Sequence, residues 1–217
     1  MKLTKFASML ASTSIAFSAF ADDHGEKDYL SPFNVIGTKS DVSRLQGSGT
    51  VLDSTDLRPF FHTDVTEILR QVPGVYVRPE EGYGLFPNIS IRGTDPNRSQ
   101  KVTILEDGIP ASPSPFSAPA AYYSPTAGRM AGFEILKGSS QLKYGPNNSG
   151  GVLNYISTPI PQDQSSYFKG SYGENNSKLA HVYSGGKLDF AGGRLGYLLE
   201  VFDQRTDGWK TIADDTT

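Results

Sequence analysis

The chain has 217 residues, a formal net charge of -3 and no cysteine. The lack of cysteine excludes disulfides, thiolate metal sites and cysteine nucleophiles. Charges of both signs are interspersed without a basic stripe, so nucleic acid is not expected as a partner. The 23 glycines, 14 prolines, 11 tyrosines and 12 phenylalanines predict many turns between aromatic-rich strands.

The N-terminus has the features of a secretory signal peptide. Lys2 and Lys5 precede a short apolar stretch, and Ala19-Phe20-Ala21 supplies the small residues that signal peptidase recognises. The stretch is shorter than the ~20 residues of a membrane-spanning helix, which argues against an anchor. We therefore expect residues 1–21 to be removed and the mature protein to be exported.

Residues 22–50 are predicted to form a flexible arm, because they are polar and rich in glycine and serine. One apolar island, Phe33–Ile36, interrupts the arm. The island is either an edge strand or an extended peptide that binds by adding a strand to the sheet of a partner.

The region 51–164 has the pattern of a small mixed domain. Thr63 or Asp64 is a suitable N-cap, Glu67 stands at capping-box spacing from Asp64, and helical periodicity predicts a helix over 64–72. Asp107-Gly108 predicts a turn. The four prolines and three serines of 110–119 argue against regular structure there. Strands are predicted over 74–78, 88–92, 101–106, 132–136 and 151–157, with short helical turns near 125–130 and 140–143.

Glycines end most of these predicted strands, and we expect them to shape the fold rather than to contact a ligand, because strand ends need positive φ or close backbone approach. They are Gly93, Gly108, Gly138, Gly145 and the pair Gly150-Gly151.

A second pattern begins near residue 165. The segments 166–173, 178–187 and 195–205 have the ~9–11-residue length of transmembrane β-strands. In the last segment Tyr197, Leu199 and Val201 share one face, while Leu198 and Phe202 interrupt the polar face. Gly192-Gly193 predicts a tight hairpin, and 173–177 a longer loop. A soluble meander fits the alternation equally well.

Six motifs, in this order and spacing, resemble the N-terminal part of TonB-dependent outer-membrane receptors. They are Leu69–Val75, Ile91–Gly93, Asp107–Pro110, Glu134–Gly138, Tyr144-Gly145 and Gly150–Asn154. Within the family, the loop after Pro110 and the segment Thr158–Asp163 are most similar to ferric citrate receptors. The resemblance implies an α+β plug domain, a small mixed sheet with short helices, followed by the start of an antiparallel transmembrane β-barrel.

The resemblance also implies roles for particular residues. Arg92 and Lys137 would pair with glutamates of the barrel wall and latch the plug. The family usually has arginine at the second position, and lysine lacks the bidentate fork, so that half of the latch is expected to be weaker or differently paired. The TonB box, which couples the receptor to the periplasmic protein TonB, would comprise Ser31, Pro32, Phe33, Asn34, Val35, Ile36, Gly37 and Thr38.

Ligand contacts are expected from loops at one end of the plug. An anionic iron chelate of the citrate type would be bound through Arg98 and nearby hydroxyl and amide groups. The candidates are Tyr83, Phe86, Asn97, Arg98, Ser99, Gln100, Ser114 and Phe116.

Enzyme and metal-site readings are not favoured. The three histidines, at 24, 62 and 181, are far apart in the sequence and lack ligand spacing. The serine-rich segments lack a nucleophile elbow. No cofactor is expected, because the chelate would be the transported ligand.

Only 53 residues follow Gln164, which is room for about three barrel strands. We therefore expect a signal peptide (1–21), an arm (22–50), a plug (51–164) and the first strands of an incomplete barrel (165–217). The chain would be the front of an outer-membrane receptor for an iron chelate, with TonB, the chelate and membrane lipid as partners. The alternative is a barrel-less soluble periplasmic binding module that uses the plug fold.

Overall fold

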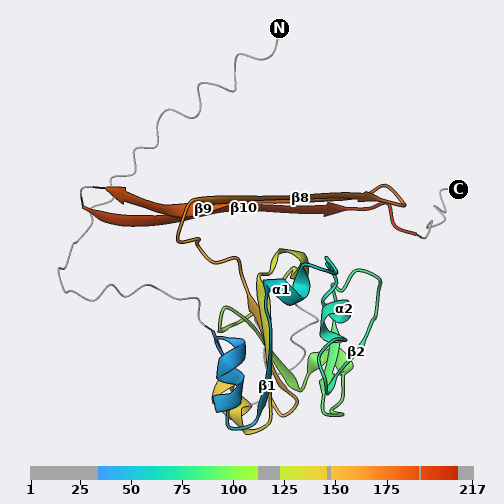
Figure 1. The fold of residues 1–217 in the computed structure, drawn as a ribbon. Coiled ribbons are helices and arrows are strands. Elements are labelled where there is room, and N and C mark those ends of the chain that lie inside the picture. Colours follow the sequence, from blue (N-terminus) through green and yellow to red (C-terminus); the bar gives the residue numbers. More distant parts are fainter. Residues whose placement is uncertain (1–33, 112–122, 146–147, 191, 210–217) are drawn as a thin grey trace, which may run out of the picture.

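The computed structural model describes residues 34–111, 123–145, 148–190 and 192–209, arranged as two layers (Figure 1). The first part of the chain forms a mixed α+β unit, and three long strands form a separate sheet that lies across it (Figure 1). The expected signal peptide at 1–21 lies outside the described residues. No described helix is long and apolar enough to cross a membrane.

The α+β unit is built on a five-stranded sheet in the order β1-β6-β7-β4-β5. Only the β4–β7 pair is parallel. The predictions of β4, β6 and β7 are confirmed to within one residue at each end. The bounds are β1 (Ser48–Leu52), β4 (Val102–Glu106), β5 (Ile109–Pro110), β6 (Gly132–Lys137) and β7 (Gly151–Ile156).

The turn at Asp107-Gly108 is confirmed, with φ of 50° and 78°. Immediately after it, Ile109 and Pro110 pair with β4 as the short strand β5. The expectation that Pro110 lies in irregular structure is therefore wrong. A proline fits here because β5 is at the edge of the sheet, where a missing N–H leaves no ladder partner unsatisfied.

The main hydrophobic core lies on one face of the sheet, under α2 (Val65–Leu69) and the hairpin of β2 (Val75–Arg78) and β3 (Asn88–Ile91). Phe133, Ile135 and Leu153 point into it from the sheet, and Leu69 from the helix. Each is buried to within 1% of full burial. Side chains of this size stabilise the fold by about 1.5–3 kcal/mol each when buried.

The predicted helix over 64–72 is shorter than expected. Asp64 caps it, and its carboxylate accepts the Thr66 N–H at 2.6 Å, as predicted. The capping-box role of Glu67 is wrong, because Glu67 pairs with Arg70 at 2.6 Å instead. The chain after Leu69 tightens into i→i+3 turns that end at Val72.

The other face of the sheet is covered by the N-terminal segment of the described chain. Val35 packs with Leu105, Leu136 and Val152 in a second, smaller cluster. The segment continues into the 3-10 helix η1 (Lys39–Arg44) and then into β1, which pairs with β6. Ordered structure therefore begins well before residue 51, and residues 34–50 are not a free arm in this structure.

The remaining short elements connect the strands. The predicted helical turns near 125–130 and 140–143 are present as η3 and η4. The bounds are α1 (Ser54–Leu57), η2 (Asn97–Ser99), η3 (Ala127–Arg129) and η4 (Ser139–Tyr144).

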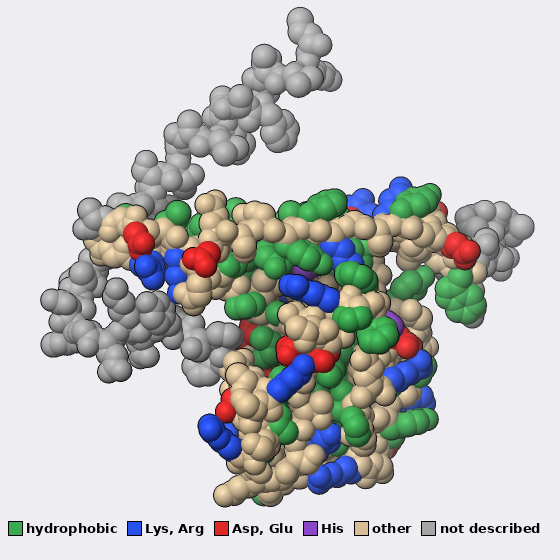
Figure 2. Space-filling view, in the orientation of Figure 1, with side chains coloured by type: hydrophobic (Ala, Val, Ile, Leu, Met, Phe, Trp, Pro, Cys, Tyr) green, Lys and Arg blue, Asp and Glu red, His purple; other side chains and the backbone are tan. Residues whose placement is uncertain are grey.

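The second layer is an antiparallel sheet of β8 (Ser165–Gly173), β9 (Ser177–Phe190) and β10 (Gly193–Arg205). Phe168, Val182 and Val201 lie side by side across it. These residues and Leu199 face away from the plug and are exposed, as hydrophobic side chains along the upper edge of Figure 2 illustrate. The predicted three strands, the shared face of Leu199 and Val201, and the hairpin before Gly193 are confirmed.

Candidate functional site

The segment Val35–Gly37 docks on the plug through its backbone. The carboxylate of Glu134 accepts the N–H groups of Val35 at 2.6 Å, Ile36 at 3.0 Å and Gly37 at 2.7 Å. Three of the eight predicted coupling residues thus contact the plug, Asn34 and Thr38 flank them, and Ser31, Pro32 and Phe33 lie outside the described residues.

The chain next to this segment is held by exposed polar contacts. Thr38 donates to Asp41 through its N–H at 3.0 Å and its hydroxyl at 2.6 Å, and these bonds lower the pKa of the Asp41 carboxyl. Lys39 forms ion pairs with Asp53 at 2.9 Å and Asp56 at 2.7 Å. Because these groups face solvent, their pairing is screened and holds the segment only weakly.

Glu134 is nearly completely buried, with 2% of its surface exposed. Its fourth donor is the side-chain amide of Asn154, whose Nδ2 donates at 2.8 Å. The Oδ1 of Asn154 accepts the Gly108 N–H at 2.9 Å. Glu134 and Asn154 both lie in the family motifs, but the sequence analysis assigned them no role. The contact of Glu134 with Val35 joins positions 99 residues apart, and no local sequence pattern indicates it.

The two predicted latch cations lie near each other. The Lys137 ammonium donates to the Thr50 hydroxyl at 3.1 Å and to the Pro73 carbonyl at 2.8 Å. Burial, and then the charge of Arg92, lower the pKa of Lys137. Arg92 has a positive φ of 56° and lies close to Gly138. Among the described residues, neither cation forms an ion pair with a carboxylate, so pairing with a barrel glutamate stays a prediction.

A polar contact that the sequence did not predict joins the plug to the strand layer. Glu200 of β10 accepts the Thr158 hydroxyl at 2.7 Å, and the same oxygen contacts His181 Nε2 of β9 at 2.8 Å. Tyr167, Tyr183 and Phe202 surround the His181 ring. Glu200 could have been suspected from the sequence, because it lies on the face of its strand opposite Leu199.

We expect Glu200→Ala to lower the free energy of unfolding by about 1–3 kcal/mol, because Thr158 and His181 lose their shared acceptor in a largely buried place. Urea unfolding of the detergent-solubilised chain would measure this loss. Glu174→Ala, which changes an exposed carboxylate between β8 and β9, is the matched control and should change little. Equal midpoints for the two variants would contradict the expectation.

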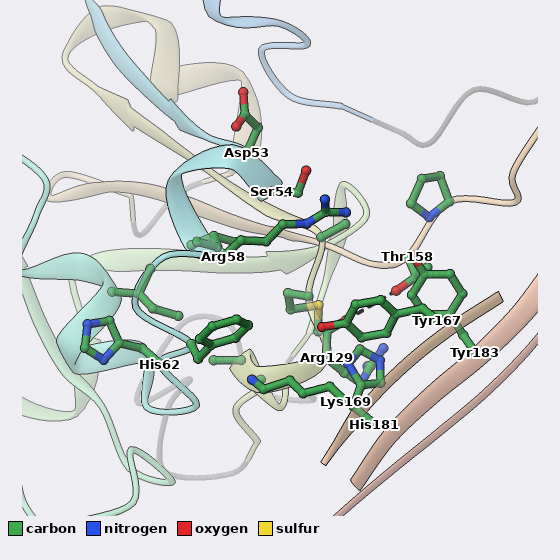
Figure 3. Close-up of a pocket in the computed structure, with 18 of the residues that line it drawn as sticks. Asp53, Ser54, Arg58, His62, Arg129, Thr158, Tyr167, Lys169, His181 and Tyr183 are labelled. Atoms are coloured by element: carbon green, nitrogen blue, oxygen red, sulfur yellow. Dashed lines mark hydrogen bonds between the residues drawn. The ribbon is translucent and has the colours of Figure 1, made fainter. Parts of the chain in front are cut away.

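A cavity of about 380 Å³ lies between the plug and the strand layer (Figure 3). Arg58 and His62 reach it from the plug, and Lys169 and His181 from the strands, as Figure 3 shows. The Lys169 ammonium lies 4.6 Å from the centre of the Phe61 ring. Arg129, also at the cavity, is paired with Glu106. Three cations, Arg58, Arg129 and Lys169, therefore line the cavity against one carboxylate, Asp53, so the lining favours anions or water.

The predicted ligand residues fall into separate environments. Tyr83 lines two cavities, of about 410 and 630 Å³, between its loop and the ends of the long strands. Glu81 organises this loop and accepts the Leu85 N–H at 2.6 Å. Phe86 lies in the same loop, 43% exposed. Among the described candidates, Tyr83 is thus placed at these cavities.

The second group of predicted contacts surrounds η2. Arg98 is paired with Glu80 at 3.0 Å, and Asn97 and Gln100 flank it. Ser99 is fully buried, donates to the Pro87 carbonyl at 2.8 Å and accepts the Ile89 N–H at 3.0 Å. Its hydroxyl therefore forms hydrogen bonds inside the plug and does not face a ligand in this structure. Ser114 and Phe116 lie outside the described residues.

Two of the three histidines, His62 and His181, lie in the described part of the chain. Within 34–111, 123–145, 148–190 and 192–209, no group of three or more histidine, aspartate or glutamate residues is placed to hold a metal ion. His181 instead contacts Glu200, and His62 stacks on Phe60.

Comparison with known proteins identifies the fold. A family model described as the TonB-dependent receptor plug domain matches residues 41–152, which is 112 of 217 residues. The ferric citrate transporter FecA in its unliganded form is 26% identical, with a TM-score of 0.65, over 78% of this chain and 27% of that chain.

Two further solved structures share the fold at lower identity. The ferric yersiniabactin uptake receptor FyuA from Yersinia pestis is 23% identical, with a TM-score of 0.53, over 67% of this chain and 22% of that chain. The ferripyoverdine receptor of the Pseudomonas aeruginosa outer membrane is 19% identical, with a TM-score of 0.57, over 72% of this chain and 20% of that chain.

The chain thus spans 20–27% of the length of these structures. The family model covers more than half of the chain. The chain therefore belongs to the family of TonB-dependent receptors, as a plug domain followed by the first strands of the antiparallel barrel.

Proposed function

We propose that the chain is the plug-containing N-terminal part of an outer-membrane receptor that takes up an iron chelate of the siderophore or ferric citrate type. Residues 1–21 would direct export, and the segment around Asn34–Thr38 would be engaged by TonB from the periplasm. The receptor would move its ligand without bond-making chemistry, so no catalytic residue or resident cofactor is proposed.

The observation that carries this proposal is the two-sidedness of the β8–β10 layer. Its outer face presents Phe168, Leu199 and Val201 to the surroundings, all more than 60% exposed. Its inner face contacts the plug through Glu200. An apolar outer surface over strands of 9, 14 and 13 residues suits contact with lipid, and a polar inner contact suits a plug enclosed by the strands.

The class of ligand is supported by similarity and by charge. The ferric citrate transporter FecA is 26% identical to this chain over the compared region. Tyr83 lines cavities at the ends of the long strands, and Arg58 and Lys169 line the cavity of about 380 Å³ between the plug and the strand layer. Cationic groups near aromatic ones would bind the carboxylates and body of an anionic iron chelate.

The proposal is tested in the bacterium that carries the gene. Deleting the gene should reduce uptake of radioactive iron supplied as citrate or as another anionic chelate, and restoring it should recover uptake. An antibody against residues 60–160 should detect the protein in the outer membrane, in a band that shifts on boiling. A band in the soluble periplasm, with uptake of every tested chelate unchanged, would instead favour the barrel-less binding module.

A further inference from the structure

We propose that Glu134 and Asn154 form a relay that holds the segment 35–37 against the plug and links it to the turn at Asp107-Gly108. The relay's regulatory role rests on the proposed receptor function, but its contacts do not. In a receptor, a displacement of the turn would change how firmly the relay holds the segment that the periplasmic partner engages.

The first step of the relay is the binding of three consecutive N–H groups by one carboxylate. Val35, Ile36 and Gly37 all donate to Glu134. Gly37 has a φ of 104°, a conformation that side-chain-bearing residues rarely adopt. Successive N–H groups turned toward one anion in this way form a nest.

The charge of Glu134 makes this docking two-state. Glu134 is buried, and no lysine, arginine or histidine of the described residues pairs with it. Three of its four hydrogen-bond donors belong to the docked segment, and the fourth is Asn154. When the segment leaves, the carboxylate loses those three donors at once, and water must replace them. A buried charge of this kind strongly disfavours partial release.

The second step is the side-chain amide of Asn154, which is fully buried. Its Nδ2 donates to Glu134 Oε2, the oxygen that also accepts the Val35 N–H. Its Oδ1 accepts the Gly108 N–H. The amide can have only this orientation. If it were flipped, its NH₂ group would face the Gly108 N–H, donor against donor, and its oxygen would face the Glu134 carboxylate, acceptor against acceptor. Hydrogen bonds joined in series through one amide strengthen one another.

The far end of the relay is a turn that is itself held firmly. Asp107 accepts the N–H of Ser157 at 3.0 Å and its hydroxyl at 2.5 Å. Ser157 follows β7 and precedes Thr158, the residue that contacts Glu200 of the strand layer. The turn therefore connects the docked segment to the plug–strand contact. Because energetic coupling between two sites is reciprocal, a displacement of the turn that loosens the segment would itself be favoured by release of the segment.

The first test measures docking directly. The chain has no cysteine, so a single Val35→Cys change gives one labelling site for a maleimide in the full chain held in detergent micelles. Val35 is 8% exposed, so labelling requires release of the segment. Glu134→Gln should speed labelling roughly ten- to hundredfold, the effect of losing charged hydrogen bonds. Glu67→Gln, an exposed acid of α2, is the matched control, and Ser43→Cys the exposed reference.

The second test reads the relay across its length. Gly37→Ala disturbs the segment outside the sheet, where a Cβ would lie 3.1 Å from Asp41 Oδ2. By nuclear magnetic resonance, hydrogen exchange of the Gly108 amide should become roughly two- to thirtyfold faster, the range of coupling between linked sites. Arg44→Ala, an exposed change in η1, should leave it unaltered. Protection of the Ile135 and Leu153 amides reports whether the sheet is intact.

Unchanged labelling in Glu134→Gln, or unchanged Gly108 exchange in Gly37→Ala, would overturn the relay. Neither test requires a chelate or the periplasmic partner. If both give the expected result while iron uptake does not depend on the gene, the proposed function fails and the relay stands. If uptake depends on the gene and either test fails, the relay is overturned and the proposed function stands.

Discussion

Phe133→Ala is expected to lower the free energy of unfolding of the plug by about 3–5 kcal/mol, the range for truncating a fully buried phenylalanine. The Phe133 ring is completely buried and packs edge-on against Tyr155, with ring centres 5.1 Å apart. The substitution would leave a cavity, and the neighbouring sheet residues would keep it from closing. The decrease in the free energy of unfolding should therefore lie within this range. Urea unfolding of the chain in detergent, followed by near-ultraviolet circular dichroism, would measure it.

Phe60→Ala is the matched control, because it removes the same ring from a position that is 60% exposed. That change should cost less than about 1 kcal/mol, since little apolar surface leaves the interior. If Phe133→Ala and Phe60→Ala shifted the urea midpoint equally, the arrangement of the core over the β6–β7 face would be wrong.

Leu199→Arg is expected to block assembly into the outer membrane. Leu199 lies on the outer face of β10 and is 73% exposed. A charge that faces lipid near the middle of the membrane costs about 2–4 kcal/mol, whereas a charge that faces water costs almost nothing. The amount of heat-modifiable protein in the outer-membrane fraction, measured by immunoblot, should therefore fall several-fold.

Leu142→Arg separates lipid exposure from water exposure. Leu142 lies in η4 of the plug and is 72% exposed, so the substitution and the exposed fraction match those at Leu199. Membrane assembly of this variant should be close to that of the unchanged protein. Equal effects of the two substitutions would show that the outer face of β10 does not contact lipid.

Much of the fold could be predicted from local pattern. Alternation on one side of β10 placed Leu199 and Val201 correctly, and Asp107-Gly108 marked a turn that is present. The interruption of the other side by Phe202 also has a physical reason. Its ring packs so closely on Gly128 of the plug that a Cβ there would lie 2.7 Å from the Phe202 Cζ. Phe202 is therefore a half-buried apolar residue on the plug-facing side of the strand, where polar residues were expected.

The parts that could not be predicted depend on contacts between distant residues. Strand β1 begins Ser48-Gly49-Thr50, a composition typical of a flexible segment, and becomes a strand because β6 offers it a paired edge. The Glu134 site combines a side chain with backbone groups almost 100 positions away. Every residue except proline has a backbone N–H, so the residue type does not indicate which N–H groups bind Glu134, and the site is found only in the structure.

The fold-back of the N-terminal segment determines how tension would reach the sheet. Residues 35–37 and Val51 lie at the same level of β6, because both contact or pair with Glu134. Ten residues, 38–47, lie between Gly37 and Ser48, and the eleven steps from Gly37 to Ser48 would extend to roughly 35–40 Å at full stretch. Traction on residue 34 would therefore first detach the Glu134 contacts and unwind η1. Force would reach strand β1 only after these residues are extended. Release of the segment and rupture of the sheet would therefore occur at different pulling distances, and the extended length between them is comparable to the thickness of a bilayer.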